Sequence, residues 1–205
     1  MFILRRFIML KLRKILVTSF MLSSLFSIGY SVANAETGTE YTFTGGFKSS
    51  DVSDLKYVVS GGNSSYQKMM EAGVQAWNDV SSKVNVSYGS DGKVSVYKST
   101  TSVSGLNGRI DPYYRNVVGG LSLDKKCVNI WETVDVFGFD NNLEKLNLDS
   151  DEKKAVYMHE MGHALSMAHN DSKKYLLMNT YTQDTVKALT LKSDDKGNLR
   201  IKWGK

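Results

Sequence analysis

The sequence contains few of the residues that cross-link a chain or interrupt its regular structure. Among 205 residues there is one cysteine, Cys127, and one proline, Pro112. A single cysteine excludes an intrachain disulfide, so packing or a bound metal must stabilise the fold. Cys127 lies beside an expected strand, and we interpret it as a small buried apolar residue rather than a reactive thiol.

Residues 1–35 have the features of an export signal. Five Lys and Arg residues precede an apolar run at 15–28, which is short for a membrane anchor. The segment ends in SVANA, where Ala33 and Ala35 form the small-x-small pattern that signal peptidases accept. We therefore predict cleavage after Ala35 and secretion, from a bacterial cell, of a single domain at 36–205.

An excess of charge of either sign is also absent from the expected mature chain. The whole sequence has 26 Lys and Arg against 21 Asp and Glu, a formal net charge of +5. Removing the five basic residues of 1–35 leaves 26 − 5 = 21 basic residues, which balance the 21 acidic ones. This balance predicts no nucleic-acid partner and no stable membrane association, and we expect a monomer.

The first half of the expected domain predicts a strand and a well-marked helix. The strand is expected at 55–59, before Gly61 and Gly62. Ser64 and Gln67 form a capping box that predicts where the helix begins. Its apolar residues repeat at helical spacing and are expected in the core: Tyr66, Met69, Met70, Gly73, Val74, Trp77 and Val80.

The middle and the end of the chain predict short strands. Four are expected, at 84–88, 93–97, 120–123 and 128–131. The Asp91-Gly92 pair predicts that the first two form a β-hairpin. Residues 99–118 are expected to be irregular, and a turn signal at 195–198 predicts a terminal hairpin. Helices and strands in this order predict an α+β domain with a mixed sheet.

A second helix is expected near residue 150. Asp149 or Ser150 can cap it, and acidic residues in its first turn complement the helix dipole. Its periodicity continues to about Ala168. At 100° per residue, the apolar positions form one face, which is expected to pack on the core: Tyr157, Met158, Met161, Ala164, Leu165 and Ala168.

All three histidines of the chain lie on or after this helix, in HEMGHALSMAH at 159–169. His159 and His163, at i and i+4, share the face opposite the core and can hold one metal ion. A hydrolytic zinc site takes three protein ligands, and a straight helix cannot supply the third. His169 can supply it if the chain leaves the helix after His163. Glu160 would then lie beside the ion as a general base.

Alternatives to this site and this function are open at the level of sequence. Asp171 or Asp184 is an alternative third ligand, whereas no glutamate follows Glu160. A secreted zinc-containing binding or adhesion module without turnover is the alternative function, although a structural zinc site needs no general base. A highly selective processing enzyme is a third alternative. Asp140 to Asn142 offer oxygen atoms without the spacing of a calcium loop, so a calcium site is unsupported and a solvated turn is expected.

HEMGHALSMAH resembles the H-E-x-x-H-x-x-G-x-x-H signature of the metzincin zinc endopeptidases, and HEMGHAL is especially similar to the matrixin-like branch. The resemblance implies a twisted, mostly parallel sheet with an active-site helix at its lower edge. It also implies a cleft in which an extended protein or peptide substrate pairs with an edge strand. In this reading Zn²⁺ is held by His159, His163 and His169, and Glu160 accepts a proton from the attacking water.

Residues outside the helix extend the resemblance and also limit it. Met178, nine residues after His169, resembles the methionine of a tight turn beneath the metal. Tyr181 is a candidate oxyanion stabiliser, although the family tyrosine usually follows two residues after the methionine, and a packing role is the alternative. Ser166 replaces the glycine of the signature. Cys127 lies inside the domain, so latency through a propeptide cysteine is not expected.

Overall fold

The computed structural model describes residues 37–39 and 41–205, so the expected export signal at 1–35 lies outside it. The strands are β1 (Thr37–Thr39), β2 (Thr42–Phe43), β3 (Leu55–Ser60), β4 (Val86–Tyr88), β5 (Val94–Ser99), β6 (Gly108–Arg115), β7 (Leu121–Leu123) and β8 (Trp131–Phe139). The helices are α1 (Ser49–Val52), α2 (Ser64–Gln75), α3 (Asp140–Lys145), α4 (Ser150–Ala164), α5 (Thr182–Ala188) and α6 (Ser193–Trp203). None of these helices is long and apolar enough to cross a membrane.

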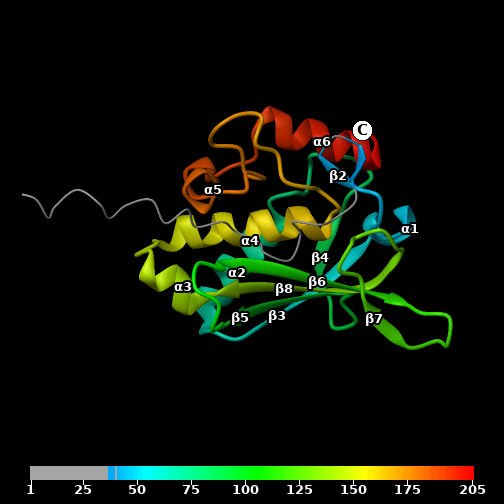
Figure 1. Cartoon of the computed structure of the whole chain (residues 1–205), viewed down its shortest axis with the longest axis horizontal. Coiled ribbons are helices and arrows are strands. Elements are labelled where there is room, and N and C mark those ends of the chain that lie inside the picture. Colours follow the sequence, from blue (N-terminus) through cyan, green and yellow to red (C-terminus); the bar gives the residue numbers. More distant parts are fainter. Residues whose placement is uncertain (1–36, 40) are drawn as a thin grey trace, which may run out of the picture.

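Six strands form one mixed sheet in the order β4-β3-β5-β8-β6-β7. The four neighbours β4, β3, β5 and β8 run parallel, and β6 is antiparallel to both β8 and β7. Helix α4 packs against α2 and over β8 and β6, with α5 and α6 on its other side, away from the sheet (Figure 1). The predicted α+β fold with a mixed sheet is confirmed, and α4 is enclosed on several sides.

The helix predicted after the first strand is present, and its apolar stripe lies in the core. Within α2 the buried members are Met69, Met70, Gly73 and Val74. The helix ends at Gln75, and Trp77 and Val80 are buried just after it. Gly73 lets α2 approach α4 closely, because a Cβ there would lie 2.9 Å from the Lys154 carbonyl oxygen. The predicted capping box of Ser64 and Gln67 is wrong, because the helix is capped one residue earlier. Asn63 is the N-cap, and its side chain accepts a hydrogen bond from the Tyr66 amide (3.0 Å).

The predicted hairpin of 84–88 and 93–97 is wrong. Both segments are strands, but β3 lies between them and pairs in parallel with β4 on one side and β5 on the other. Gly92 packs on the backbone of β3, where a Cβ would lie 2.8 Å from the Tyr57 carbonyl carbon. Alternating apolar residues indicate a strand, but they do not identify the strand with which it pairs.

Residues 99–118, expected to be irregular, contain the eight-residue strand β6. The Pro112 carbonyl accepts from the Asp124 amide (2.8 Å) on the side of β6 away from β8. The N–H and C=O of a strand residue point to the same side, so the N–H that proline lacks would not have bonded to β8. The hydrogen bonds between β6 and β8 are therefore intact. β6 pairs with β8 from Gly108 to Tyr114, but with β7 only from Tyr113 onward. Its first half is therefore an edge.

Two other segments also differ from the prediction. The terminal hairpin is wrong, since residues 193–203 form helix α6. The solvated turn expected at 140–142 is instead the start of α3, and Asp140 accepts from the Tyr66 hydroxyl (2.9 Å) and pairs with Lys98 (2.9 Å). Asn142 donates to the Leu106 carbonyl (2.7 Å). These side chains are engaged by protein groups, which leaves the calcium alternative without support.

Cys127 is a buried free thiol, as predicted. Burial raises its pKa to about 12. A thiol with such a pKa is almost entirely protonated near neutral pH, so it is a poor nucleophile.

Candidate metal centre

The helix that carries the first two histidines has a strong start and an early end. Asp149 is the N-cap of α4, and its carboxylate accepts from the amides of Asp151 and Glu152 (both 2.9 Å). Glu152 completes the capping box by accepting from the Asp149 amide (3.0 Å). The helix ends at Ala164 rather than near Ala168. The chain thus leaves the helical path where the third ligand requires it.

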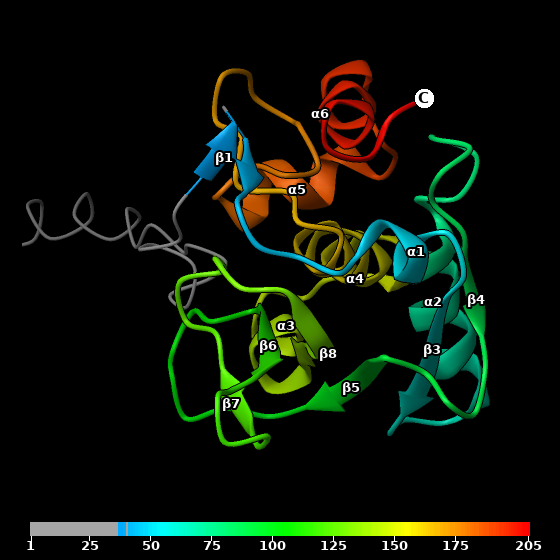
Figure 2. The same ribbon diagram turned by 90° about the vertical axis from the view of Figure 1, so that its right-hand side faces the viewer.

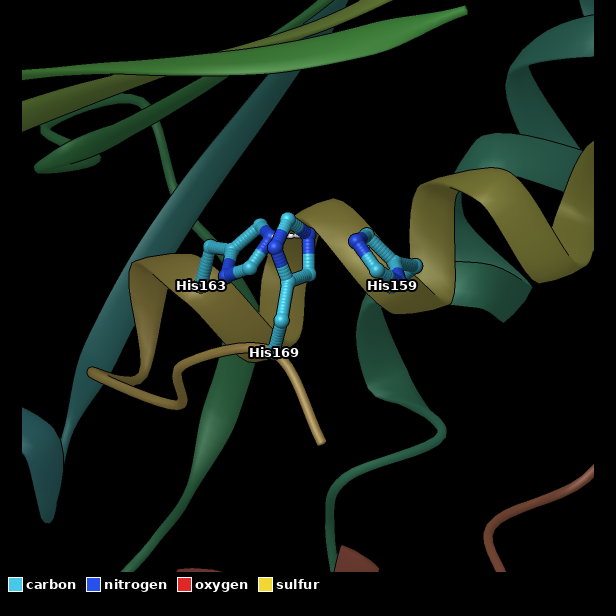
Figure 3. A group of neighbouring side chains, drawn as sticks. All are labelled: His159, His163 and His169. Atoms are coloured by element: carbon cyan, nitrogen blue, oxygen red, sulfur yellow. Dashed lines mark hydrogen bonds between the residues drawn. The ribbon is translucent and has the colours of Figure 1, made fainter. Parts of the chain in front are cut away.

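A tight turn after α4 carries the chain to the third histidine. Ser166 has φ 67°, in the left-handed region that a glycine adopts easily. The Met167 amide donates to the Gly162 carbonyl (2.9 Å), which closes the turn. The serine therefore adopts a backbone conformation suited to the glycine of the signature, and it brings His169 back over His163 (Figure 3).

The three imidazoles converge on one point. One ring nitrogen from each of His159, His163 and His169 lies within 4.8 Å of the others, and Nε2 of His163 is 3.2 Å from Nε2 of His169. Nδ1 of His159 donates to the Leu177 carbonyl (2.7 Å). Nδ1 of His163 likewise donates to the Met167 carbonyl (2.7 Å). Because carbonyls only accept, each of these two rings carries its proton on Nδ1 and has an unprotonated Nε2 that can bind a metal.

The electrostatics of the three rings suit a metal ion. Burial lowers the pKa of His159 to about 3 and that of His169 to about 4, and it lowers the pKa of His163 well below its usual value. The rings are therefore neutral near pH 7, which is the form that binds metals. Nε2 of His159 is buried and has no hydrogen-bond partner among the described residues. This donor set fits zinc, which takes three imidazoles in hydrolytic sites.

Neither alternative third ligand lies in this group. In the described part of the chain, the three histidines form the only cluster of metal-ligating side chains. Asp171 instead holds the loop after the site, because its carboxylate accepts from the amide (2.8 Å) and the hydroxyl (2.7 Å) of Thr180. Asp184 lies in the first turn of α5.

Glu160 is fully buried beside the histidines. Neither carboxylate oxygen has a hydrogen-bond partner among the residues that the structure describes. Burial raises its pKa well above the usual value, and the Arg109 cation acts in the opposite direction. Gly108, at the start of β6, lies against it, since a Cβ there would be 2.3 Å from Oε1 of Glu160. Gly108 lies in the segment expected to be irregular and was not predicted as a site residue, although a glycine in a strand often marks such a close approach.

Met178 lies under α4, where a Cβ on Gly162 would be 2.4 Å from its sulfur. Asp195 of α6, expected in a terminal hairpin, holds the turn at Leu177 and Met178. Its carboxylate accepts from the amides of Leu177 (3.2 Å) and Met178 (3.3 Å). The Leu177 carbonyl in turn accepts from His159. Asp195 thus supports a candidate ligand through one intervening peptide.

Tyr181 follows the turn that contains Met178 and lies at the start of α5. It is the N-cap of α5, and its amide donates to the side chain of Asn179 (3.0 Å). Within residues 41–205, its ring makes no hydrogen bond or ring contact with His159, His163 or His169. A role in oxyanion stabilisation stays a prediction.

Segments near the two ends of the described chain pack on the turn between α4 and His169. The sequence does not predict these contacts. The segment from β2 to α1 passes across the end of α4 near α6 (Figure 2). Phe43 stacks on His163, with ring centroids 5.7 Å apart, and its amide donates to the Ser166 carbonyl (2.8 Å). From α6, Lys202 donates to the carbonyls of Phe43 (2.6 Å) and Gly45 (3.1 Å). These contacts join segments that are far apart in sequence.

The close approach of Gly46 to Ser166 predicts that substitutions at these two positions have coupled effects on stability. The Ser166 hydroxyl is buried and has no partner in the described chain, and a Cβ on Gly46 would lie 2.1 Å from it. Ser166→Gly should raise the free energy of unfolding by about 1 kcal/mol, because it relieves left-handed strain and an unpaired hydroxyl. Gly46→Ala should lower it by about 3 kcal/mol or more, because it adds a clash at φ 145°.

Urea unfolding of both single variants and the double variant tests this coupling. We expect Gly46→Ala to cost less in the Ser166→Gly background, because the clash with the hydroxyl is gone. Strict additivity, or a clear loss of stability in Ser166→Gly alone, would contradict this account of the turn.

The family comparison agrees with the fold and the site. Residues 113–202, which include α4, all three histidines and Met178, match the family model described as Matrixin. Over these residues the chain is similar to the matrixins, which belong to the metzincin class of zinc metalloproteases. The resemblance predicted from HEMGHALSMAH is confirmed.

Among solved structures, two of myroilysin are similar to this chain. One has 17% sequence identity and a TM-score of 0.34, and the alignment covers 56% of this chain and 48% of that chain, less than half of its length. The other has 13% identity and a TM-score of 0.43, with 88% of this chain and 95% of that chain covered. A comparison with curated proteins finds no match.

Proposed function

We propose that this chain is a secreted zinc-dependent endopeptidase that uses Glu160 as general base. One observation carries the proposal: three neutral imidazoles converge from α4 and the turn after it, and Glu160, the residue after His159 in α4, has a buried carboxylate without a partner among the described residues. Burying a carboxylate without a partner costs several kcal/mol. Such a cost is expected where the group has a chemical task.

The protein residues would divide the work between binding and proton transfer. His159, His163 and His169 would hold the ion. Zinc bound there would supply Lewis-acid chemistry, which lowers the pKa of a water molecule to about 7 and polarises a carbonyl. Glu160 would accept the proton of the attacking water and return it to the leaving amine. Its buried position keeps bulk water from competing for that proton.

Strand β6 offers a place for an extended substrate. From Gly108 to Asp111, no described strand pairs with the edge of β6 away from β8. An extended peptide can add to such an edge through main-chain hydrogen bonds. Because Gly108 lies against Glu160, a peptide on this edge would pass close to the base. This arrangement supports an endopeptidase rather than an enzyme that acts on small molecules.

Metal removal tests the proposed function. We expect the full chain, expressed with zinc and purified in its processed form, to cleave an unstructured protein such as casein. A chelator should lower this activity by at least about 100-fold, and added zinc should restore it, because the ion supplies the Lewis acid. A serine-protease inhibitor serves as the control and should have no effect.

Two results would contradict the proposal in different ways. Cleavage that persists in chelator would show that the activity does not come from this site. Tight zinc binding without cleavage of casein or of a diverse peptide library would instead favour the zinc-containing binding module.

A further inference from the structure

The large exposed apolar side chains gather at one corner of the molecule. Six of them lie between residues 117 and 130, on the β6–β7 hairpin and the loop after it: Val117, Val118, Leu121, Leu123, Val128 and Ile130. Val117 is 105% exposed and Val118 is 87% exposed. The other described examples lie singly elsewhere: Tyr88, Val103, Tyr175, Leu189 and Ile201. A local concentration of this kind marks an interaction site more often than scattered residues do.

The tip of the hairpin is a preformed turn that holds its valines away from the protein. The Asn116 amide donates to the Gly120 carbonyl (2.8 Å), and the Gly119 amide donates to the Asn116 carbonyl (2.9 Å). The Asn116 side chain also accepts from the amides of Val118 (3.1 Å) and Gly120 (3.0 Å). In Figure 1 the hairpin extends beyond the rest of the sheet. The valines are therefore presented outward by a defined turn.

The charges around this tip are mainly positive. Arg115 precedes the turn with its side chain 58% exposed, and Lys125 and Lys126 are exposed just after β7. Neither lysine forms an ion pair in residues 41–205. Of the acidic neighbours, Glu132 lies 3.6 Å from Arg115, and Asp124 is buried. A protruding apolar tip followed by unpaired lysine side chains is complementary to a surface with an apolar interior and anionic groups on its outside.

We propose that this hairpin docks reversibly on an anionic lipid surface. Val117, Val118 and Leu121 would enter the interfacial region, while Lys125 and Lys126 would contact acidic headgroups. The tip is convex, so a rigid protein surface would cover its valines only in part, whereas a lipid interface deforms around them. The balanced charge of the expected mature chain predicts no stable membrane association. A small local patch is consistent with weak, reversible docking.

Docking at this corner would bring the candidate active site near the lipid. β6 runs directly from the hairpin to Gly108, which lies against Glu160. At about 3.3 Å per residue, the tip and the site are separated by roughly 30 Å along the strand. The proposed docking rests on the exposed residues alone and does not depend on peptidase activity.

Vesicle co-sedimentation tests this proposal with the processed protein. The probes are phosphatidylcholine vesicles and vesicles that contain about one-third phosphatidylglycerol as the anionic lipid. We expect binding to the anionic vesicles that weakens in high salt. Val117→Ser with Val118→Ser should lower the partition coefficient about tenfold, and Lys125→Ala with Lys126→Ala should lower it by a similar factor. Val103→Ser and Lys68→Ala are matched exposed controls and should bind like the wild type.

Three outcomes would overturn the proposal. The first is that the wild type does not bind anionic vesicles, and the second is that the hairpin variants bind as well as the controls. The third is a concentration-dependent dimer, detected by sedimentation, that the valine substitutions abolish while lipid binding is unchanged. That result would assign the tip to a second copy of the chain. Unfolding measurements on each variant separate a folding defect from a docking defect.

Discussion

Replacing Glu160 by glutamine is expected to lower kcat/KM for peptide hydrolysis by about 1000-fold or more while zinc binding persists. Glutamine has nearly the same shape but cannot accept a proton near neutral pH. The side chain is fully buried against Gly108 and outside the histidine group, so the substitution should leave the ligands in place. Steady-state cleavage of a quenched peptide and zinc analysis of the same sample measure both effects.

Glu152→Gln provides a matched control on the same helix. Glu152 closes the capping box at the start of α4, and glutamine can also accept the Asp149 amide. We expect its kcat/KM to stay within about twofold of the wild type, since surface changes of this kind shift stability little. If Glu160→Gln kept more than about a tenth of the wild-type rate, another group would have to be the base.

Replacing His169 by alanine should weaken zinc binding by well over 100-fold. Loss of a residue that only supports a metal ligand typically costs about 10- to 100-fold, and the loss of a ligand itself should exceed that range. The reason is geometric: His159 and His163 both come from α4, and His169 supplies the ligand from outside the helix. Competition with a chromophoric zinc chelator measures the affinity directly, and circular dichroism of the same variant shows whether α4 is still folded.

Asp171→Asn and Asp184→Asn separate this ligand set from its alternatives. Neither carboxylate is in the histidine group, so Asp184→Asn should bind zinc like the wild type. Asp171→Asn disturbs the contact with Thr180 and removes a negative charge that acts on His169, so zinc affinity should fall by less than about tenfold, the smaller end of an indirect effect. Near-normal affinity in His169→Ala together with a large loss in Asp171→Asn would show that the aspartate is the third ligand.

The candidate site could be predicted from sequence to the extent that its parts are local. His159, Glu160 and His163 lie within five residues, and helical geometry alone places the two histidines on one face. The expectation for His169 followed from the need for a ligand outside the helix. The apolar positions predict one face of this helix that packs on the core. In the structure the histidine face is buried as well.

The residues that sequence reasoning missed act from distant parts of the chain. Gly108 was placed in an irregular segment because glycine and proline are poor strand residues in general. Asp195 begins a turn signal at 195–198, which predicts a hairpin. No residue near it in sequence indicates that its carboxylate accepts from the amides of Leu177 and Met178. Phe43 reaches the site only because the chain returns past the end of α4.

The sequence by itself determined the start of α4, the spacing of its metal ligands and the mixed α and β character of the domain. Each of these depends on contacts between residues a few positions apart, which propensity and periodicity describe well. Only the tertiary structure decided that β3 lies between β4 and β5, that the first half of β6 is an unpaired edge beside Glu160, and that α6 supports the turn at Leu177 and Met178. Strand order and long-range hydrogen bonds depend on how all the apolar faces are buried together, and no single segment specifies that arrangement.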